Sequence, residues 1–277
     1  MNEPPKYDPR RYRGTAWYYS RFRPPYPPVL VTLLRENYRL DGSGRLFDLG
    51  CGPGPVAIPL AHLFEEVIAI DPEPEMLEEG RQSAARAGVT NIRWMVGSSE
   101  DLPASLGQFR QITMGNSFHW MDRARTLETL YDLVTEDGGL AVVGHGAPIP
   151  APPPTVWRAA IDDVVRRYRG DIHVPWAPIE VPPEQRHEAF LNASRFKGLK
   201  PYQESFDIPW TVDSILGNLY SMSFCSRRLL GDRVADFERD LRAAVLAVEP
   251  SGILTGEPPE FFAYMVWKHR RRFQIIP

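Results

Sequence analysis

LFDLGCGPGPVA, residues 46–57, places three glycines and two prolines directly after a short apolar run. Glycine adopts positive φ without a Cβ clash, and it lets another molecule lie against the backbone. The alternating Gly50, Gly52 and Gly54 therefore predict a strand that ends in a bend suited to contact with a ligand. An ordinary tight turn can carry the same glycines, so the rest of the chain must decide between the two readings.

Length and composition favour one large globular domain with insertions. The chain has 277 residues, 43% hydrophobic and 24% charged, with a formal net charge of −3. This balance gives no general electrostatic reason to expect a nucleic acid as partner. Two cysteines, Cys51 and Cys225, cannot build a disulfide framework, so we expect a reducing cytoplasm. No apolar run approaches the roughly 20 residues of a membrane span, so we expect a soluble protein with no membrane partner.

Strand and helix patterns alternate from residue 46 to residue 144. The helix expected after Pro55 carries Val56, Leu60, Leu63 and Phe64 at helical spacing. Later strands are expected at 67–70, 91–97, 110–118 and 140–144, and helices at 74–87 and 124–134. Gly138 and Gly139 are expected to turn the chain into the last of these strands. Such alternation predicts an α/β fold, a doubly wound and mostly parallel sheet.

The second half of the chain differs in character. The proline-rich stretch HGAPIPAPPPTVW, residues 145–157, predicts an extended connector. We expect helices near 155–169, 184–196, 211–221 and 232–247, and strands at 202–208 and 261–267. Residues 146–195 and 211–258 are interpreted as insertions over the carboxyl edge of the sheet. The predicted division is a lid at 1–45, a ligand-binding core at 46–145, and cap insertions with the last two strands of the core sheet at 146–277.

Two ligand classes use a glycine turn after the first strand of such a sheet. The dinucleotide fingerprint G-x-G-x-x-G requires a third glycine where this chain has Pro55, which disfavours a dinucleotide. Asp71, at the end of the second strand, can accept hydrogen bonds from ribose hydroxyls in either class. It therefore supports a nucleoside and leaves S-adenosylmethionine as the better candidate.

Four segments in order resemble a known family: FDLGCGPG (47–54), AIDPEPEML (69–77), GSSEDLP (97–103) and SFHWMD (117–122). They are similar to the class I S-adenosylmethionine-dependent methyltransferases. Within these they resemble the small-molecule branch that includes the type 11 methyltransferases and trans-aconitate methyltransferase. The resemblance covers residues 7–144 well and implies a Rossmann-like, seven-stranded sheet with a helical cap after strands 5 and 6.

The resemblance also implies a cofactor site. Asp48 would receive the ammonium of S-adenosylmethionine, Asp71 would hold the ribose, and Arg23 would bind the carboxylate. Relatives often carry an acid where Ser98 stands, which leaves the adenine contacts open. The full set of implied cofactor-binding residues is Tyr19, Arg23, Asp48, Gly50, Gly52, Gly54, Asp71, Pro72, Met76, Ser99, Glu100, Asn116 and Ser117.

Phe118, His119 and Trp120 would begin the substrate side in the same resemblance. His119 is the candidate catalytic residue because its side chain can exchange protons near neutral pH. Three roles stay open for it: general base, substrate-orienting donor, or packing of the pocket floor. The six histidines show no metal-ligand spacing, so we expect no metal.

We expect the protein to transfer a methyl group to a small-molecule acceptor in specialised biosynthesis. The acceptor atom is left open. One alternative is a cyclase that binds S-adenosylmethionine without transferring its methyl group. Another is an RNA methyltransferase, because residues 1–23 carry six basic and two acidic side chains among tyrosines. A third is a nucleotide-sensing protein that merely keeps the fold.

Overall fold

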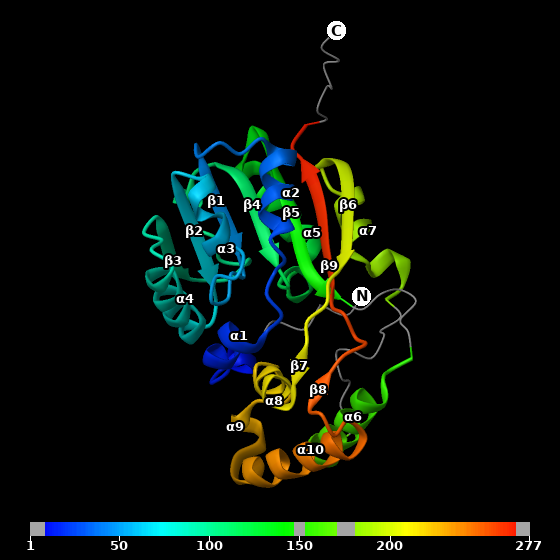
Figure 1. The fold of residues 1–277 in the computed structure, drawn as a ribbon. Helices are drawn as coiled ribbons and strands as arrows, with labels where there is room; N and C mark the ends of the chain where they lie inside the picture. Colours follow the sequence, from blue (N-terminus) through cyan, green and yellow to red (C-terminus); the bar gives the residue numbers. More distant parts are fainter. Residues whose placement is uncertain (1–8, 147–152, 171–180, 270–277) are drawn as a thin grey trace.

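A seven-stranded sheet forms the centre of the molecule, in a computed structural model that describes residues 9–146, 153–170 and 181–269 (Figure 1). The strand order is β3-β2-β1-β4-β5-β9-β6, and only β9 runs antiparallel to its neighbours. This is the predicted doubly wound, mostly parallel sheet. Its strands are β1 (Arg45–Leu49), β2 (Glu66–Asp71), β3 (Ile92–Val96), β4 (Phe109–Gly115), β5 (Val134–Gly146), β6 (Lys197–Ser205) and β9 (Glu260–Trp267).

Helices cover both faces of the sheet. One face buries α2 (Val29–Tyr38), α3 (Ala57–Leu60) and one side of α4 (Pro74–Arg86). The other buries α5 (Arg123–Leu133) and α7 (His187–Ala193). Side chains on both faces of β1, β2 and β4 lie under helices, so nearly all residues of these strands are buried, including the polar Asp48, Gln111 and Thr113.

Local sequence signals set most helix boundaries. The Glu73 side chain accepts a hydrogen bond from the Glu75 N–H and caps α4, which begins at Pro74. The Asp122 side chain caps α5 by accepting from the Arg125 N–H. The helix expected after the glycine turn is a single turn, continued by 3₁₀ geometry. Short 3₁₀ segments occupy Pro9–Tyr12, Ala61–Leu63, Ala104–Leu106, Phe118–Trp120, Pro183–Gln185 and Gly231–Arg233.

The prediction of a turn at Gly138 and Gly139 is wrong. Both glycines lie inside β5, which begins at Val134 and has an irregular register with β4. An ideal Cβ on Gly139 would lie 2.4 Å from the Tyr38 ring, whose hydroxyl donates to the Leu140 carbonyl at 2.7 Å. The glycine therefore makes room for an α2 side chain, a requirement that a local sequence pattern does not reveal.

A helical cap lies beyond the carboxyl ends of the parallel strands (Figure 1). Its apolar cluster includes Trp157, Phe237 and Leu241, which are all at most 5% exposed. The predicted cap helices near 155–169, 211–221 and 232–247 are confirmed, whereas β6 begins five residues before the predicted strand. The elements of the cap are α6 (Val156–Arg169), β7 (Trp210–Thr211), α8 (Val212–Tyr220), α9 (Arg227–Leu230), α10 (Val234–Val248) and β8 (Ile253–Leu254).

Helix α1 (Ala16–Phe22) joins the core to the cap. On the core side, Arg21 donates to the Glu79 carboxylate of α4 at 2.8 Å. On the cap side, the Phe22 ring packs on Gly217 of α8 so closely that an ideal Cβ there would lie 2.2 Å from it. Residues 1–45 therefore contain two different elements, since α2 packs on the sheet and α1 lies at its carboxyl edge.

Candidate cofactor pocket

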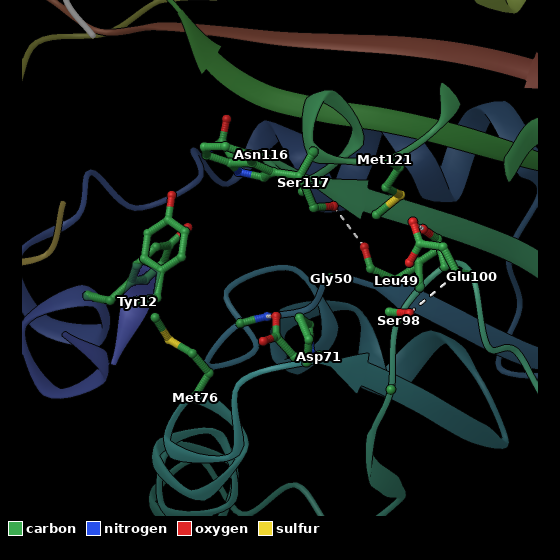
Figure 2. A pocket seen from close by; sticks show the side chains of 17 residues that line it. Tyr12, Leu49, Gly50, Asp71, Met76, Ser98, Glu100, Asn116, Ser117 and Met121 are labelled. Atoms are coloured by element: carbon green, nitrogen blue, oxygen red, sulfur yellow. Dashed lines mark hydrogen bonds between the residues drawn. The ribbon is translucent and has the colours of Figure 1, made fainter. Parts of the chain in front are cut away.

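A pocket opens at the carboxyl ends of β1, β2 and β4. In Figure 2, Asn116 and Ser117 lie above it, Asp71 below it, and Tyr12 and Met76 face Ser98 and Glu100 across it. Crevices outside the carboxyl ends of parallel strands are the usual ligand sites of open α/β sheets. The residues that line it are Tyr12, Tyr19, Leu49, Gly50, Gly52, Asp71, Pro72, Met76, Gly97, Ser98, Ser99, Glu100, Gly115, Asn116, Ser117, Trp120 and Met121.

The three glycines of the turn all have left-handed φ, between +53° and +81°, and they serve different purposes. An ideal Cβ on Gly50 would lie 2.5 Å from the Ser117 Cβ, and one on Gly54 would lie 2.7 Å from the Trp94 ring. At Gly52 a Cβ would meet nothing within 4 Å. Gly52 therefore leaves backbone open toward the pocket, whereas Gly54 lies outside the pocket lining and packs on β3.

Two buried carboxyl groups lie at or beneath the turn. Asp71 accepts hydrogen bonds from the Gly52 N–H at 2.8 Å and from the Glu73 N–H at 2.9 Å. Asp48 lies outside the pocket lining, and its Oδ1 accepts from the Thr113 hydroxyl at 2.7 Å. Its buried Oδ2 has no partner among the described residues. Burial raises the pKa of Asp48 to about 7 and that of Asp71 to about 6.

The turn after β3 supplies the wall opposite Tyr12. Ser98, Ser99 and Glu100 all line the pocket, although only the last two were expected there. The Ser98 hydroxyl accepts from the Glu100 N–H at 3.3 Å, so this serine shapes the turn. The Glu100 carboxylate is the acidic group that this wall contributes to the pocket lining.

The segment before α2 supplies an aromatic wall. Tyr19 lines the pocket as expected, and Tyr12 joins it with ring centroids 6.4 Å apart. Burial raises the pKa of Tyr19 to about 12, so its hydroxyl stays protonated. Arg23 lies outside the lining, over the Tyr19 ring at 5.0 Å, and donates to the Ser221 carbonyl at 3.4 Å. Its buried Nε–H has no partner among the described residues.

Of the residues that follow β4, some line the pocket and others are buried in the core. Asn116, at φ +49°, and Ser117 line the pocket, and the Ser117 hydroxyl donates to the Leu49 carbonyl at 2.8 Å. Trp120 lines it as well. Phe118, expected on the substrate side, is instead buried in the core at 1% exposed, because the 3₁₀ turn points its ring at the α5 face.

His119 is exposed to solvent but lies outside the pocket lining. Its ring centroid is 4.9 Å from Trp120 and 6.5 Å from His187 of α7. Desolvation by neighbouring protein atoms, followed by the charges of His187, Arg123 and Arg23, lowers the pKa of His119 to about 4. A neutral imidazole therefore lies at the edge of the pocket.

Several lining residues were not predicted from the sequence: Tyr12, Leu49, Gly97, Ser98, Gly115 and Met121. Leu49, Gly97 and Gly115 lie at strand ends beside predicted residues, so the strand boundaries could have indicated them. Tyr12 and Met121 reach the pocket only because 3₁₀ turns direct them there. The described residues contain no group of three or more His, Cys, Asp or Glu side chains placed to hold a metal ion.

Comparisons with known proteins agree with this geometry. Residues 46–138 match the sequence model of a family described as a methyltransferase domain. The chain carries a class I methyltransferase domain. An uncharacterised methyltransferase of Mycobacterium tuberculosis is 29% identical over 45% of this chain and 48% of its own length. The match thus spans about half the length of such curated relatives.

Solved structures extend the likeness of the fold to most of the chain. YjhP of Escherichia coli has a TM-score of 0.57 and 14% identity, covering 94% of this chain and all of its own. YcgJ of Bacillus subtilis has a TM-score of 0.53 and 18% identity, covering 87% and 99%. S-adenosylmethionine is the cofactor that this class implies. Among the described residues, no helix is both long and apolar enough to cross a membrane.

Proposed function

We propose that the protein transfers a methyl group from S-adenosylmethionine to a small-molecule acceptor. The observation that carries the proposal is the pocket at the glycine turn, where the open backbone of Gly52 lies beside the Asp71 carboxylate. Such a turn admits a ligand against the backbone and gives it a hydrogen-bond acceptor at the same place.

Unpaired polar atoms near the turn fit the two charged groups at the amino-acid end of the cofactor. The free Asp48 Oδ2 would accept from the ammonium, and the free Arg23 Nε–H would donate to the carboxylate. Asp71 already accepts two backbone hydrogen bonds, but its oxygens have further lone pairs for ribose hydroxyls. Met76 and Pro72 would face Glu100 and Ser99 across the adenine. The bound cofactor would supply a methyl group already activated by its sulfonium.

The chain's own contribution is then to position the acceptor and exclude water. Asn116 and Ser117 would lie beneath the reacting centre, and Trp120 would separate it from the acceptor entrance. His119, exposed beside Trp120, is proposed as a substrate-binding residue at that entrance. The lid α1 and the cap would close over the acceptor.

The basic residues near the amino terminus support a small molecule over RNA. Within the described residues, Arg21 pairs with Glu79, Arg23 donates to Ser221, and Arg11 lies over the Trp120 ring at 5.1 Å. These three cations make contacts within the described part of the chain. An apolar cap over the pocket suits a partly apolar acceptor, so we place the reaction in specialised biosynthesis. We further propose a cytoplasmic location, with both cysteines free.

Titration calorimetry with S-adenosylmethionine tests the proposal. Asp71→Ala should weaken binding by about 1.5–3 kcal/mol, the loss expected for hydrogen bonds to a charged acceptor. Asp163→Ala, an exposed aspartate of α6, is the matched control and should bind like the wild type. A folded wild-type protein that binds neither S-adenosylmethionine nor S-adenosylhomocysteine would contradict the proposal. Binding without release of S-adenosylhomocysteine in the presence of cell metabolites would favour the cyclase.

A further inference from the structure

Helix α1 and the 3₁₀ turn at Pro9–Tyr12 close one side of the cofactor pocket. Tyr12 and Tyr19, from these two elements, line the pocket, and so does Met76 of α4. Tyr12 and Met76 lie on the same side of the pocket in Figure 2. Helix α1 itself lies between α4 of the core and α8 of the cap, and it packs on both (Figure 1). The contact between α1 and α4 therefore forms one border of the pocket.

The contact between α1 and α4 is polar, and Glu79 of α4 is at its centre. The Glu79 Oε1 accepts hydrogen bonds from two α1 side chains, the Ser20 hydroxyl at 3.1 Å and Arg21 Nη1 at 2.8 Å. One turn earlier on the same face of α4, the Glu75 carboxylate accepts from the Gly14 N–H at 2.6 Å. Glu79 itself lies outside the pocket lining. It therefore ties α1 to the core without reaching the cofactor site.

The Glu79 side chain holds α1 as a carboxylate. It is only 8% exposed. Burial by itself would raise the pKa of Glu79, but hydrogen bonds from Arg21, Arg86 and Ser20 lower it below its ordinary value. Arg86 belongs to α4 and donates to Oε1 at 3.1 Å, so it holds the carboxylate from its own helix. Hydrogen bonds to a charged acceptor are stronger than neutral ones, so a neutral amide at this position would hold α1 less firmly.

The contact between α1 and the cap is apolar. The Tyr18 ring lies edge-on to the Tyr220 ring of α8, with centroids 5.2 Å apart. The Phe22 ring packs so closely on Gly217 that it leaves no room for a Cβ there. Water can replace the partners of a partly exposed ion pair at little cost, whereas separating apolar surfaces exposes them to water. Helix α1 should therefore part from α4 more easily than from α8.

We propose that Glu79 is a latch that keeps α1 closed over the cofactor pocket, and that S-adenosylmethionine enters and S-adenosylhomocysteine leaves where α1 separates from α4. The inference rests on the proposed function and adds to it the route of the cofactor. Separation moves Tyr12 and Tyr19 away from Met76 and opens the border that they share. Because Glu79 does not line the pocket, it favours closure equally with and without the cofactor. The latch therefore sets how fast the cofactor exchanges and not how tightly it binds.

Stopped-flow measurement of S-adenosylhomocysteine exchange tests the latch, with tryptophan fluorescence as the signal because Trp120 lines the pocket. Glu79→Gln keeps the shape of the side chain and removes its charge. We expect the association and dissociation rate constants to rise together, about 3- to 30-fold, while the dissociation constant stays within about twofold of the wild type. Glu78→Gln is the matched control. Glu78 pairs with Arg81 of its own helix at 3.4 Å, so this variant should exchange like the wild type.

A reversible cross-link tests the route. Three hydrogen bonds in series, through Glu79 and Arg86, join the Ser20 hydroxyl of α1 to the Ser83 hydroxyl of α4. A protein with Ser20→Cys and Ser83→Cys can therefore be linked across the contact by a reducible bis-maleimide, since both native cysteines are buried. Linking should slow the exchange of S-adenosylhomocysteine at least about 100-fold relative to the unlinked protein, and reduction should restore it.

The outcomes separate this inference from the proposed function. Glu79→Gln rate constants that equal those of the wild type, or that do not rise together, would overturn the latch. A linked protein that exchanges S-adenosylhomocysteine as fast as the unlinked one would overturn the route. Each of these results leaves the methyltransferase proposal intact, because the protein still binds the cofactor product. A folded wild type that binds neither S-adenosylmethionine nor S-adenosylhomocysteine in calorimetry would contradict both.

Discussion

The glycine-turn pocket and the helical cap lie side by side at the carboxyl edge of the sheet, but they are built differently. Around the turn, buried polar groups remain partly unpaired, as at Asp48 and Arg23. In the cap, an apolar cluster excludes water while ion pairs such as Arg239–Asp236 lie at the surface. Buried polar atoms without a described partner occur there as well, for example Asn218 Oδ1, so they do not distinguish the two regions. The difference is that the turn and the neighbouring strand ends line the pocket, whereas no described cap residue does. We infer that the turn binds the ligand and that the cap shapes the space around it.

The largest expected effect is on cofactor affinity, and it comes from substituting one of two matched glycines, one in each region. Gly52 has φ +53° and Gly231 of the cap has φ +57°, and neither Cβ would meet an atom within 4 Å. Gly52→Val should weaken S-adenosylmethionine binding more than about 100-fold, since the branched side chain would fill the space beside the backbone. Gly231→Val carries the same left-handed backbone and should bind normally.

Both valine variants should also lose at least about 1–2 kcal/mol of unfolding free energy, because the left-handed conformation is strained for any side chain. Chemical denaturation measures this loss, and calorimetry measures the affinity. Normal binding by a folded Gly52→Val protein would mean that the turn serves only to reverse the chain.

A smaller effect is expected where the two regions meet. Gly217→Ala adds a methyl group against the Phe22 ring and should cost about 1–3 kcal/mol of unfolding free energy by overpacking. The displaced α1 carries Tyr19, so S-adenosylmethionine affinity should fall several-fold. Combining it with Phe22→Leu should recover much of both losses. If affinity does not change while stability falls, then α1 does not transmit strain from the cap to the pocket.

The most gradual effect concerns pH. Burial raises the pKa of Asp48 from 3.8 to about 7, so the folded protein keeps a proton that the unfolded chain has lost. This stabilising contribution is complete below about pH 4 and declines as pH rises to about 7, with a slope of at most about 1.4 kcal/mol per pH unit. Asp48→Asn should reduce this slope in denaturation curves measured at pH 4 to 8 and, above about pH 6, where Asp71 has already ionised, should nearly remove it.

Bound S-adenosylmethionine should change the titration of Asp48. An ammonium beside Asp48 favours the ionised carboxylate, so S-adenosylmethionine should bind more tightly at pH 8 than at pH 5 in the wild type. The matched Asp48→Asn protein should show a smaller difference. An identical pH dependence in both proteins would place the ammonium elsewhere.

Strand ends were the most predictable part of the site. The apolar runs before Gly50 and Asp71 indicated where two strands stop, and parallel strands bring such ends to one edge of the sheet. The strand expected at 110–118 ends earlier, at Gly115. Residues beyond those ends were harder to place. Phe118 and Trp120 are two positions apart in one 3₁₀ turn, yet one ring lies in the core and the other in the pocket. Short turns have no long periodicity from which a buried side can be inferred.

The amino-acid sequence by itself determined the alternating strands and helices, the glycine turn and the acids at its edge, because these depend on neighbours along the chain. Only the tertiary structure decided that Phe22 packs on Gly217, that Tyr12 forms a pocket wall, and that His145 bonds to Asn116. The last of these contacts exists because β4 and β5 pair in parallel and end side by side. Contacts between distant segments depend on how whole layers pack, and that packing is a property of the folded chain and not of any short segment.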